Sequence, residues 1–191
     1  MSGAVVYTIG HSTHTLAQFI ALLRTHSTQT VADVRTVPRS RRVPQFNKES
    51  LAGELRAGGI GYVHMKELGG WRRARKDSPN TGWRNAGFRA YADYLLTQEF
   101  EAAISRLMSL AQRERIAIMC AEAVPWRCHR SLIADALTVR GVEVRHITGV
   151  DAAESHELTQ FAKVDGARIT YPATGPGPEQ PALDMPRSER S

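Results

Sequence analysis

Cysteines, long apolar runs and a basic leader are scarce or missing in this sequence, and each absence excludes a class of protein. The chain has two cysteines in 191 residues, too few for a disulfide framework, which fits a reducing compartment. No apolar run approaches the ~20 residues that a membrane-spanning helix needs. The N-terminal MSGAVVYTIGHS lacks the basic region of a signal peptide and runs straight into a strand pattern. We therefore expect a cytoplasmic protein without a membrane partner.

Positive charge, in contrast, is in excess. The formal net charge is +6, and residues 35–89 alone hold thirteen Lys or Arg against four Asp or Glu. A patch of this kind attracts polyanions, with nucleic acid, and DNA in particular, as the first partner to consider. A solubilising surface explains the same charge equally well.

Apolar runs alternate with helical patterns along the chain. Strands are predicted at 4–10, 30–35, 60–65, 115–122 and 142–148, and helices at 13–25, 47–58, 88–96, 99–113 and 129–140. This alternation predicts an α/β fold, a single-domain three-layer sandwich with a mostly parallel, five-stranded, Rossmann-like sheet. The domain is expected to span 1–171, and the proline-rich residues 172–191 to form a flexible tail.

Polar side chains follow each predicted strand. In an open parallel sheet, ligands bind in the crevice outside the carboxyl ends of the strands, so these side chains should meet at one cleft. The set comprises His11 and Ser12 after the first strand, Asp33 and Arg35 after the second, His64 near the end of the third, Cys120 and Glu122 after the fourth, and His146 in the fifth.

Two loops combine arginines with aromatic residues. Guanidinium groups match phosphate oxygens, and aromatic rings stack on bases, so both loops are predicted to bind nucleic acid. The first loop supplies Arg35, Arg39, Arg41, Arg42 and Phe46, and the second supplies Trp71, Arg72, Arg73, Arg75 and Trp83. The alternative is that both tryptophans are core residues beside a solvated basic fringe.

The segment CAEAVPWRCHR, residues 120–130, has the highest density of side chains that can take part in catalysis. Two mechanisms fit this segment poorly. A cysteine phosphatase loop needs an arginine at the position where this chain has Trp126, and Glu122 would repel a bound dianion. A zinc site usually has its cysteines about two to four residues apart. Cys120 and Cys128 are eight apart. No metal and no cofactor are therefore expected.

A third mechanism, acid–base chemistry on an anion-binding scaffold, fits the same segment better. Cys128 and His129 fall at the start of a predicted helix, where free N–H groups favour negative charge and lower the pKa of a thiol. Arg127 and Arg130 flank this helix start. Glu122 is then a base or acid, with Asp33 as its partner. The alternative is that both cysteines are buried structural residues and that Glu122 pairs with Arg130 or His129.

Seven stretches together resemble the bacterial and archaeal family named domain of unknown function 488. They are TIGHS (8–12), DVRTVPRS (33–40), FNKESL (46–51), YVHMKELGG (62–70), FRAYADYL (88–95), CAEAVPWRCHRSLIADAL (120–137) and VRHI (144–147). The resemblance implies a compact α/β domain with shared polar residues at the strand ends. It implies no catalytic assignment.

The combined pattern favours an enzyme acting on nucleic acid, a DNA-repair hydrolase or glycosylase that handles a damaged or extruded base. Glu122 or Asp33 would activate water, with His129 and Cys128 nearby. Lys48 or Lys66 would be the amine if the reaction passes through a Schiff base. The alternatives are an enzyme acting on a small phosphorylated or nucleotide substrate, and a non-enzymatic binding module. The oligomeric state is left open.

Overall fold

Six strands form the central sheet of the computed structural model, which describes residues 4–173. β1 (Val5–Gly10), β2 (Thr30–Asp33), β3 (Gly61–His64), β4 (Ile116–Cys120) and β5 (Glu143–Ile147) are parallel and lie in the order β3-β2-β4-β1-β5. These are the five strands that the sequence predicts. A short sixth strand, β6 (Ala153–Ser155), pairs antiparallel with β5 at one edge. The expected tail lies outside the described residues apart from Pro172 and Ala173.

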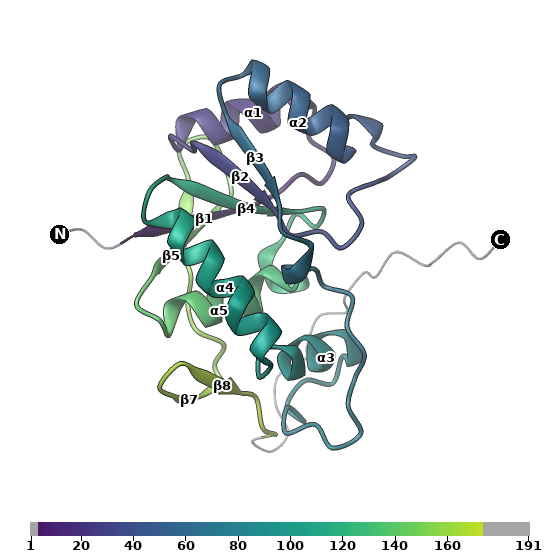
Figure 1. Cartoon of the computed structure of the whole chain (residues 1–191), viewed down its shortest axis with the longest axis vertical. Coiled ribbons are helices and arrows are strands. Elements are labelled where there is room, and N and C mark those ends of the chain that lie inside the picture. The colour runs from purple at the N-terminus through teal and green to yellow at the C-terminus, as the bar shows by residue number, and fades with distance from the viewer. Residues whose placement is uncertain (1–3, 174–191) are drawn as a thin grey trace.

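Helices cover both faces of the sheet (Figure 1). α1 (Leu16–Thr25) and α2 (Lys48–Ala57) lie on one face, and α3 (Ala86–Tyr94), α4 (Gln98–Ala111) and α5 (Arg130–Thr138) lie on the other. The connections contain the short 3-10 helices η1 (Pro44–Phe46), η2 (Lys66–Leu68) and η3 (Pro125–Arg127), and a hairpin of β7 (Lys163–Asp165) and β8 (Arg168–Thr170) follows β6. The predicted three-layer α/β sandwich is confirmed.

Alternation along the strands divides the core between the two helical layers. In β4, Ile116 and Ile118 pack in a hydrophobic cluster with buried residues of α3, α4 and α5. Ala117 and Met119 point to the other face and pack in a second cluster with buried residues of α1 and α2. Every residue of β4 is buried. This strand is therefore a central one, and its polar end must lie inside the structure.

Among residues 4–173, no helix combines the length and apolar character that crossing a membrane requires.

The connections of β1 and β4 place the crevice of the sheet. The chain leaves β1 for β2 and β3 on one side, and it leaves β4 for β5 on the other side. The connections that follow the neighbouring strands β1 and β4 therefore run in opposite directions across the sheet. In parallel sheets, ligands bind at such a reversal, outside the carboxyl ends of the strands.

Candidate functional site

A cleft of about 670 Å³ opens at the carboxyl ends of β1, β2 and β4. Its walls are the loop after β2, the loop at residues 70–71 and the segment that joins β4 to α5. The structure brings together in this cleft many of the residues that the sequence singles out, namely His11, Ser12, Arg35, Arg39, Arg42, Trp71, Cys120, Glu122, Arg127, Cys128 and His129. Residues far apart in the chain thus share one concave surface of a size that suits a small ligand.

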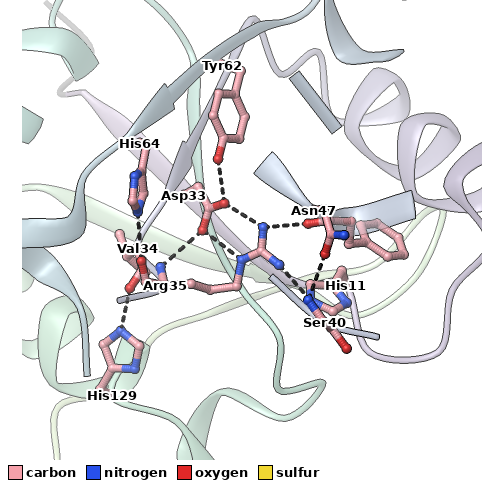
Figure 2. Close-up of polar contacts among 10 residues, drawn as sticks. His11, Asp33, Val34, Arg35, Ser40, Asn47, Tyr62, His64 and His129 are labelled. Carbon is pink, nitrogen blue, oxygen red and sulfur yellow. Dashed lines mark hydrogen bonds and ion pairs between the residues drawn. The ribbon is translucent and has the colours of Figure 1, made fainter. Parts of the chain in front are cut away.

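Asp33 and Arg35 form a buried ion pair beneath this cleft (Figure 2). Arg35 Nε donates to Asp33 Oδ1 at 2.9 Å, and Nη2 donates to Asp33 Oδ2 at 2.6 Å and to the carbonyl oxygen of Phe46 at 2.8 Å. The hydroxyl of Tyr62 also donates to Asp33 Oδ2, at 2.7 Å, and burial followed by the Asp33 charge raises the pKa of Tyr62. Because both carboxylate oxygens are occupied, Asp33 positions Arg35 and is not free to act as the predicted base.

His11 lies against this pair as a neutral ring. Its ring stacks on Phe46 with centroids 4.3 Å apart, and its Nδ1 lies 3.2 Å from the carbonyl oxygen of Ser12. Burial and the adjacent Arg35 charge lower the pKa of His11 to about 4. With Nδ1–H donating to Ser12, Nε2 is left to accept from Arg35 Nη1 at 3.3 Å. His11 is therefore an acceptor at neutral pH.

Two further histidines hold the end of β2 through backbone carbonyl groups (Figure 2). His64 Nε2 lies 2.9 Å from the carbonyl oxygen of Arg35, and His129 Nε2 lies 3.1 Å from that of Val34. In each pair the imidazole N–H must be the donor. The Nδ1 atom of His129 is then an acceptor, and it lies 3.5 Å from Cys128 Sγ. Burial lowers the pKa of His129, so its ring is neutral at pH 7.

Arg130 is buried behind the cleft wall, with 1 % of its surface exposed. Its Nε donates to Cys120 Sγ at 2.9 Å, Nη1 donates to Thr8 Oγ1 at 3.1 Å, and Nη2 donates to the carbonyl oxygen of Glu122 at 2.6 Å. The guanidinium thus holds the turn after β4 together. This corrects the expectation that Arg130 binds substrate, because its donors face the protein interior.

Glu122 sits in the cleft wall because its backbone packs directly on the end of β1. The amides of His11 and Ser12 donate to the carbonyl oxygens of Cys120 and Ala121, at 3.0 and 2.9 Å. Ser12 has φ of 42°, a left-handed conformation that is uncommon outside glycine. The Glu122 side chain is half-buried in the wall, and its Oε1 accepts from the amide of Ala123 at 3.1 Å.

The loop after β2 presents its arginines on the cleft surface. Asn47 Oδ1 accepts from the amide of Ser40 at 2.7 Å, and Ser40 Oγ accepts from the amide of Arg42 at 3.2 Å, so the loop is folded on itself. Arg39 and Arg42 are exposed and line the cleft. Trp71 lies on the same surface with 48 % of its area exposed. Arg41 is exposed but does not line the cleft.

Phe46 and Trp83 do not have the predicted stacking role. Phe46 is fully buried between His11 and Phe19, and Trp83 is 6 % exposed and stacks on Phe88 with centroids 4.6 Å apart. Neither ring has a face free for a base. The alternative interpretation, in which the tryptophans are core residues, is therefore correct for Trp83 and wrong for Trp71.

The lysines and the second basic loop also lie differently from the prediction. Lys48 is exposed beside His64 in a separate small pocket, and Lys66 is exposed as well. Neither amine is in the desolvated pocket that a Schiff-base lysine needs. Arg72 packs its guanidinium over the ring of Tyr94, 3.5 Å from the centroid, while Arg73 is exposed and outside the cleft.

A protein-family model described as "Domain of unknown function DUF488" matches residues 15–137. The chain belongs to this family. The resemblance seen in the sequence motifs is thereby confirmed. The matched range contains Asp33, Arg35, Glu122, Cys128 and His129, whereas His11 and Ser12 precede it. Comparisons with curated proteins and with solved structures found no match.

Sequence reasoning missed several residues of this family member's cleft. Thr36, Ser40, Val43 and Gly70 line it, and none carries a charge that would have drawn attention. Gly70 has a specific role, because a Cβ there would lie 2.7 Å from His129 Nδ1. The paired glycines at 69–70 were the sequence signal for such a close approach.

Proposed function

We propose that this protein is an enzyme that hydrolyses a bond in a nucleotide unit of nucleic acid, with the N-glycosidic bond of an extruded base as the first candidate. One arrangement supports the proposal above others. The Glu122 carboxylate shares a cleft with the exposed guanidinium groups of Arg39 and Arg42 and with the exposed ring of Trp71. An acid–base group, anion-binding groups and a stacking surface thus lie within reach of one ligand.

The two arginines suit the phosphate groups on either side of a bound nucleotide. Arg35 and Arg130 have their donors occupied by protein atoms, so they cannot serve. Arg39 and Arg42 lie on the exposed loop at the cleft, where forked donors match phosphate oxygens. Contacts of this kind bind the backbone without reading its sequence.

Trp71 and Val37 suit the base. Both side chains line the cleft and are about half exposed, at 48 % and 52 %. Exposed apolar surface beside arginines is the usual combination for binding an unstacked base. An enzyme that acts on a base in a duplex must extrude that base into a pocket, and a cleft of about 670 Å³ has room for one nucleotide.

Glu122 is the group for the chemical step. As the general base it takes a proton from water, the water oxygen bonds to C1′ of the sugar, and the C1′–N bond breaks as the base leaves with a proton from solvent. Asp33, its predicted partner, is occupied by Arg35 and Tyr62. Glu122 therefore carries this step in the proposal.

A small phosphorylated or nucleotide substrate is the second candidate. The observation in its favour is the cleft volume of about 670 Å³, which is enough for a free nucleotide beside the same two arginines. Salt dependence separates the two candidates, because binding of duplex DNA weakens with salt by a log–log slope of about −0.9 per phosphate contact.

The test is a cleavage assay on labelled oligonucleotides that each carry uracil, an oxidised guanine, an alkylated adenine or an abasic site. Glu122→Gln is compared with wild type and with Glu154→Gln, a matched change on the exposed edge strand β6. Base release or strand scission that disappears only in Glu122→Gln supports the proposal. Equal activity in all three excludes Glu122 as the base.

The same assay distinguishes the remaining functions. Intact oligonucleotides together with steep salt-dependent binding would indicate a binding module. With neither cleavage nor binding, nucleic acid is excluded and phosphorylated metabolites become the substrates to screen.

A further inference from the structure

Cys120 and Cys128 meet on the floor of the cleft. Both are free thiols, and their Sγ atoms lie 2.7 Å apart. A disulfide bond is about 2.05 Å long, so joining the two sulfurs requires a small movement. Cys120 ends the central strand β4, and Cys128 directly follows η3. Two separate elements therefore hold the thiols in contact.

The charge of Arg130 is compensated by no carboxylate among residues 4–173. Its hydrogen bonds go to Cys120 Sγ, Thr8 Oγ1 and the carbonyl oxygens of Glu122 and Ala123. A buried cation is strongly unfavourable unless an anion lies beside it. The cysteine pair supplies that anion when one thiol loses its proton. The thiolate is the reactive form of cysteine, and a neighbouring guanidinium favours it by lowering the pKa of the thiol.

His129 provides the route for the proton. Its Nε2–H donates to the carbonyl oxygen of Val34, and this leaves Nδ1 as an acceptor 3.5 Å from Cys128 Sγ. A nucleophile, a base and a group that orients the base are thus arranged in sequence. Burial alone would raise the pKa of Cys128, but the hydrogen bond from Cys120 and the Arg130 charge together lower it to about 7. Burial raises the pKa of Cys120, so Cys128 ionises first.

Both cysteines line the cleft, although only 2 % of Cys120 and 3 % of Cys128 is exposed. So small an exposed area is accessible to a small oxidant but not to a thiol of another protein. From these contacts we propose that Cys120 and Cys128 are a redox-active dithiol, which a hydroperoxide oxidises to a disulfide inside the cleft.

The two steps balance with one peroxide. The Cys128 thiolate attacks one oxygen of hydrogen peroxide, the O–O bond breaks, and water leaves once the departing hydroxide takes a proton, giving a sulfenic acid. Cys120 then attacks the Cys128 sulfur, the S–O bond breaks, a second water leaves and the disulfide forms. Two thiols are oxidised and one peroxide is reduced to two waters. A small dithiol such as dithiothreitol reverses the reaction.

The test measures the oxidation state of the two thiols, so its outcome is independent of the proposed hydrolase or glycosylase activity. The reduced full-length protein is exposed to hydrogen peroxide, denatured and treated with N-ethylmaleimide, and its intact mass is measured. We expect a monomer that has lost two hydrogens and takes up no maleimide. Dithiothreitol should restore uptake of two maleimides.

Single variants identify the roles of the two cysteines. In Cys120→Ser, Cys128 should stop at the sulfenic acid, which dimedone traps. In Cys128→Ser, Cys120 should stay reduced at the same exposure. The proposal is overturned if wild type keeps two alkylatable thiols at an exposure that fully oxidises glutathione, or if the disulfide joins two chains. The wild-type measurement decides the matter even where a variant folds poorly.

Discussion

The guanidinium of Arg35 binds both carboxylate oxygens of Asp33, at 2.9 and 2.6 Å, from a position two residues along the same chain. Asp33 is fully buried and Arg35 is 8 % exposed. The third arginine nitrogen faces His11, so this pair joins the end of β2 to the end of β1. An arginine that the sequence marks as a phosphate ligand is in fact part of the frame of the cleft.

Asp33→Asn should therefore destabilise the protein strongly. The substitution leaves the buried charge of Arg35 without its anion, and breaking a buried pair in this way lowers the free energy of unfolding by about 3–5 kcal/mol. Asp77→Asn is the matched control, because Asp77 forms an equivalent pair with Arg75 on the surface, and it should have no measurable effect. Urea denaturation followed by circular dichroism measures both. Equal stability of the two variants would contradict a structural role for Asp33.

Gly10→Ala should disturb the cleft through the backbone. A Cβ at Gly10 would lie 1.8 Å from the carbonyl oxygen of Glu122, so the turn after β4 would have to move. We expect a decrease of about 1–3 kcal/mol in the free energy of unfolding. In Gly53→Ala the new Cβ meets nothing within 4 Å, and α2 should gain up to about 1 kcal/mol. Thermal unfolding of both variants shows whether the loss of stability comes from the contact of the new Cβ with Glu122 or from the loss of a glycine in general.

Stability should fall as the pH is lowered from about 6.5 to about 4. Burial lowers the pKa of His146, like that of His11, to about 4, whereas an unfolded histidine has a pKa of about 6.5. Between these values the unfolded chain binds more protons than the folded one. The contribution of each ring is thus complete above the unfolded pKa and is lost towards the folded pKa, by about 1.4 kcal/mol per pH unit.

His146→Gln isolates one of these two contributions. Its free energy of unfolding should vary less steeply with pH than that of wild type between about pH 6.5 and about pH 4.5. At pH 8 and above the two profiles should run parallel, since both rings are then neutral in both states. Denaturant titrations at a series of pH values give the slopes. Identical slopes below pH 6.5 would show that His146 takes up its proton without unfolding.

The succession of β1 to β5 and α1 to α5 along the chain followed from periodicity, because each of these strands is a short apolar run and each helix has an apolar face. The short strands β6, β7 and β8 were missed, since three-residue strands carry no measurable periodicity. The meeting of His11, Glu122 and His129 was predictable in outline, because all parallel strands end at one edge of the sheet.

Side-chain roles within the cleft were less predictable, because they depend on which partner each group meets. Phe46 and Trp71 occur in similar basic loops, yet Phe46 is buried under His11 and Trp71 is half exposed. Arg35 and Arg39 likewise occur in the same basic loop, yet Arg35 is buried against Asp33 and Arg39 is exposed. Composition and spacing do not record such contacts. The contact of Cys120 with Cys128 also depends on how the turn between them folds.

Replacing the two exposed cleft arginines should weaken binding of duplex DNA and reduce its salt dependence. In Arg39→Gln/Arg42→Gln, the log–log slope of affinity against salt should become shallower by about 0.9 for each phosphate that the protein no longer neutralises. Arg106→Gln/Arg113→Gln removes the same charge from exposed sites on and just after α4, and neither of these residues lines the cleft.

Fluorescence anisotropy with a labelled duplex at several salt concentrations gives the slopes of wild type and both double variants. If the cleft arginines contact phosphates, the slope becomes shallower only in Arg39→Gln/Arg42→Gln. The control variant Arg106→Gln/Arg113→Gln keeps the wild-type slope. If both slopes change equally, net charge alone attracts the DNA. The cleft would then have no role in binding the backbone, and the small phosphorylated substrate would become the better candidate.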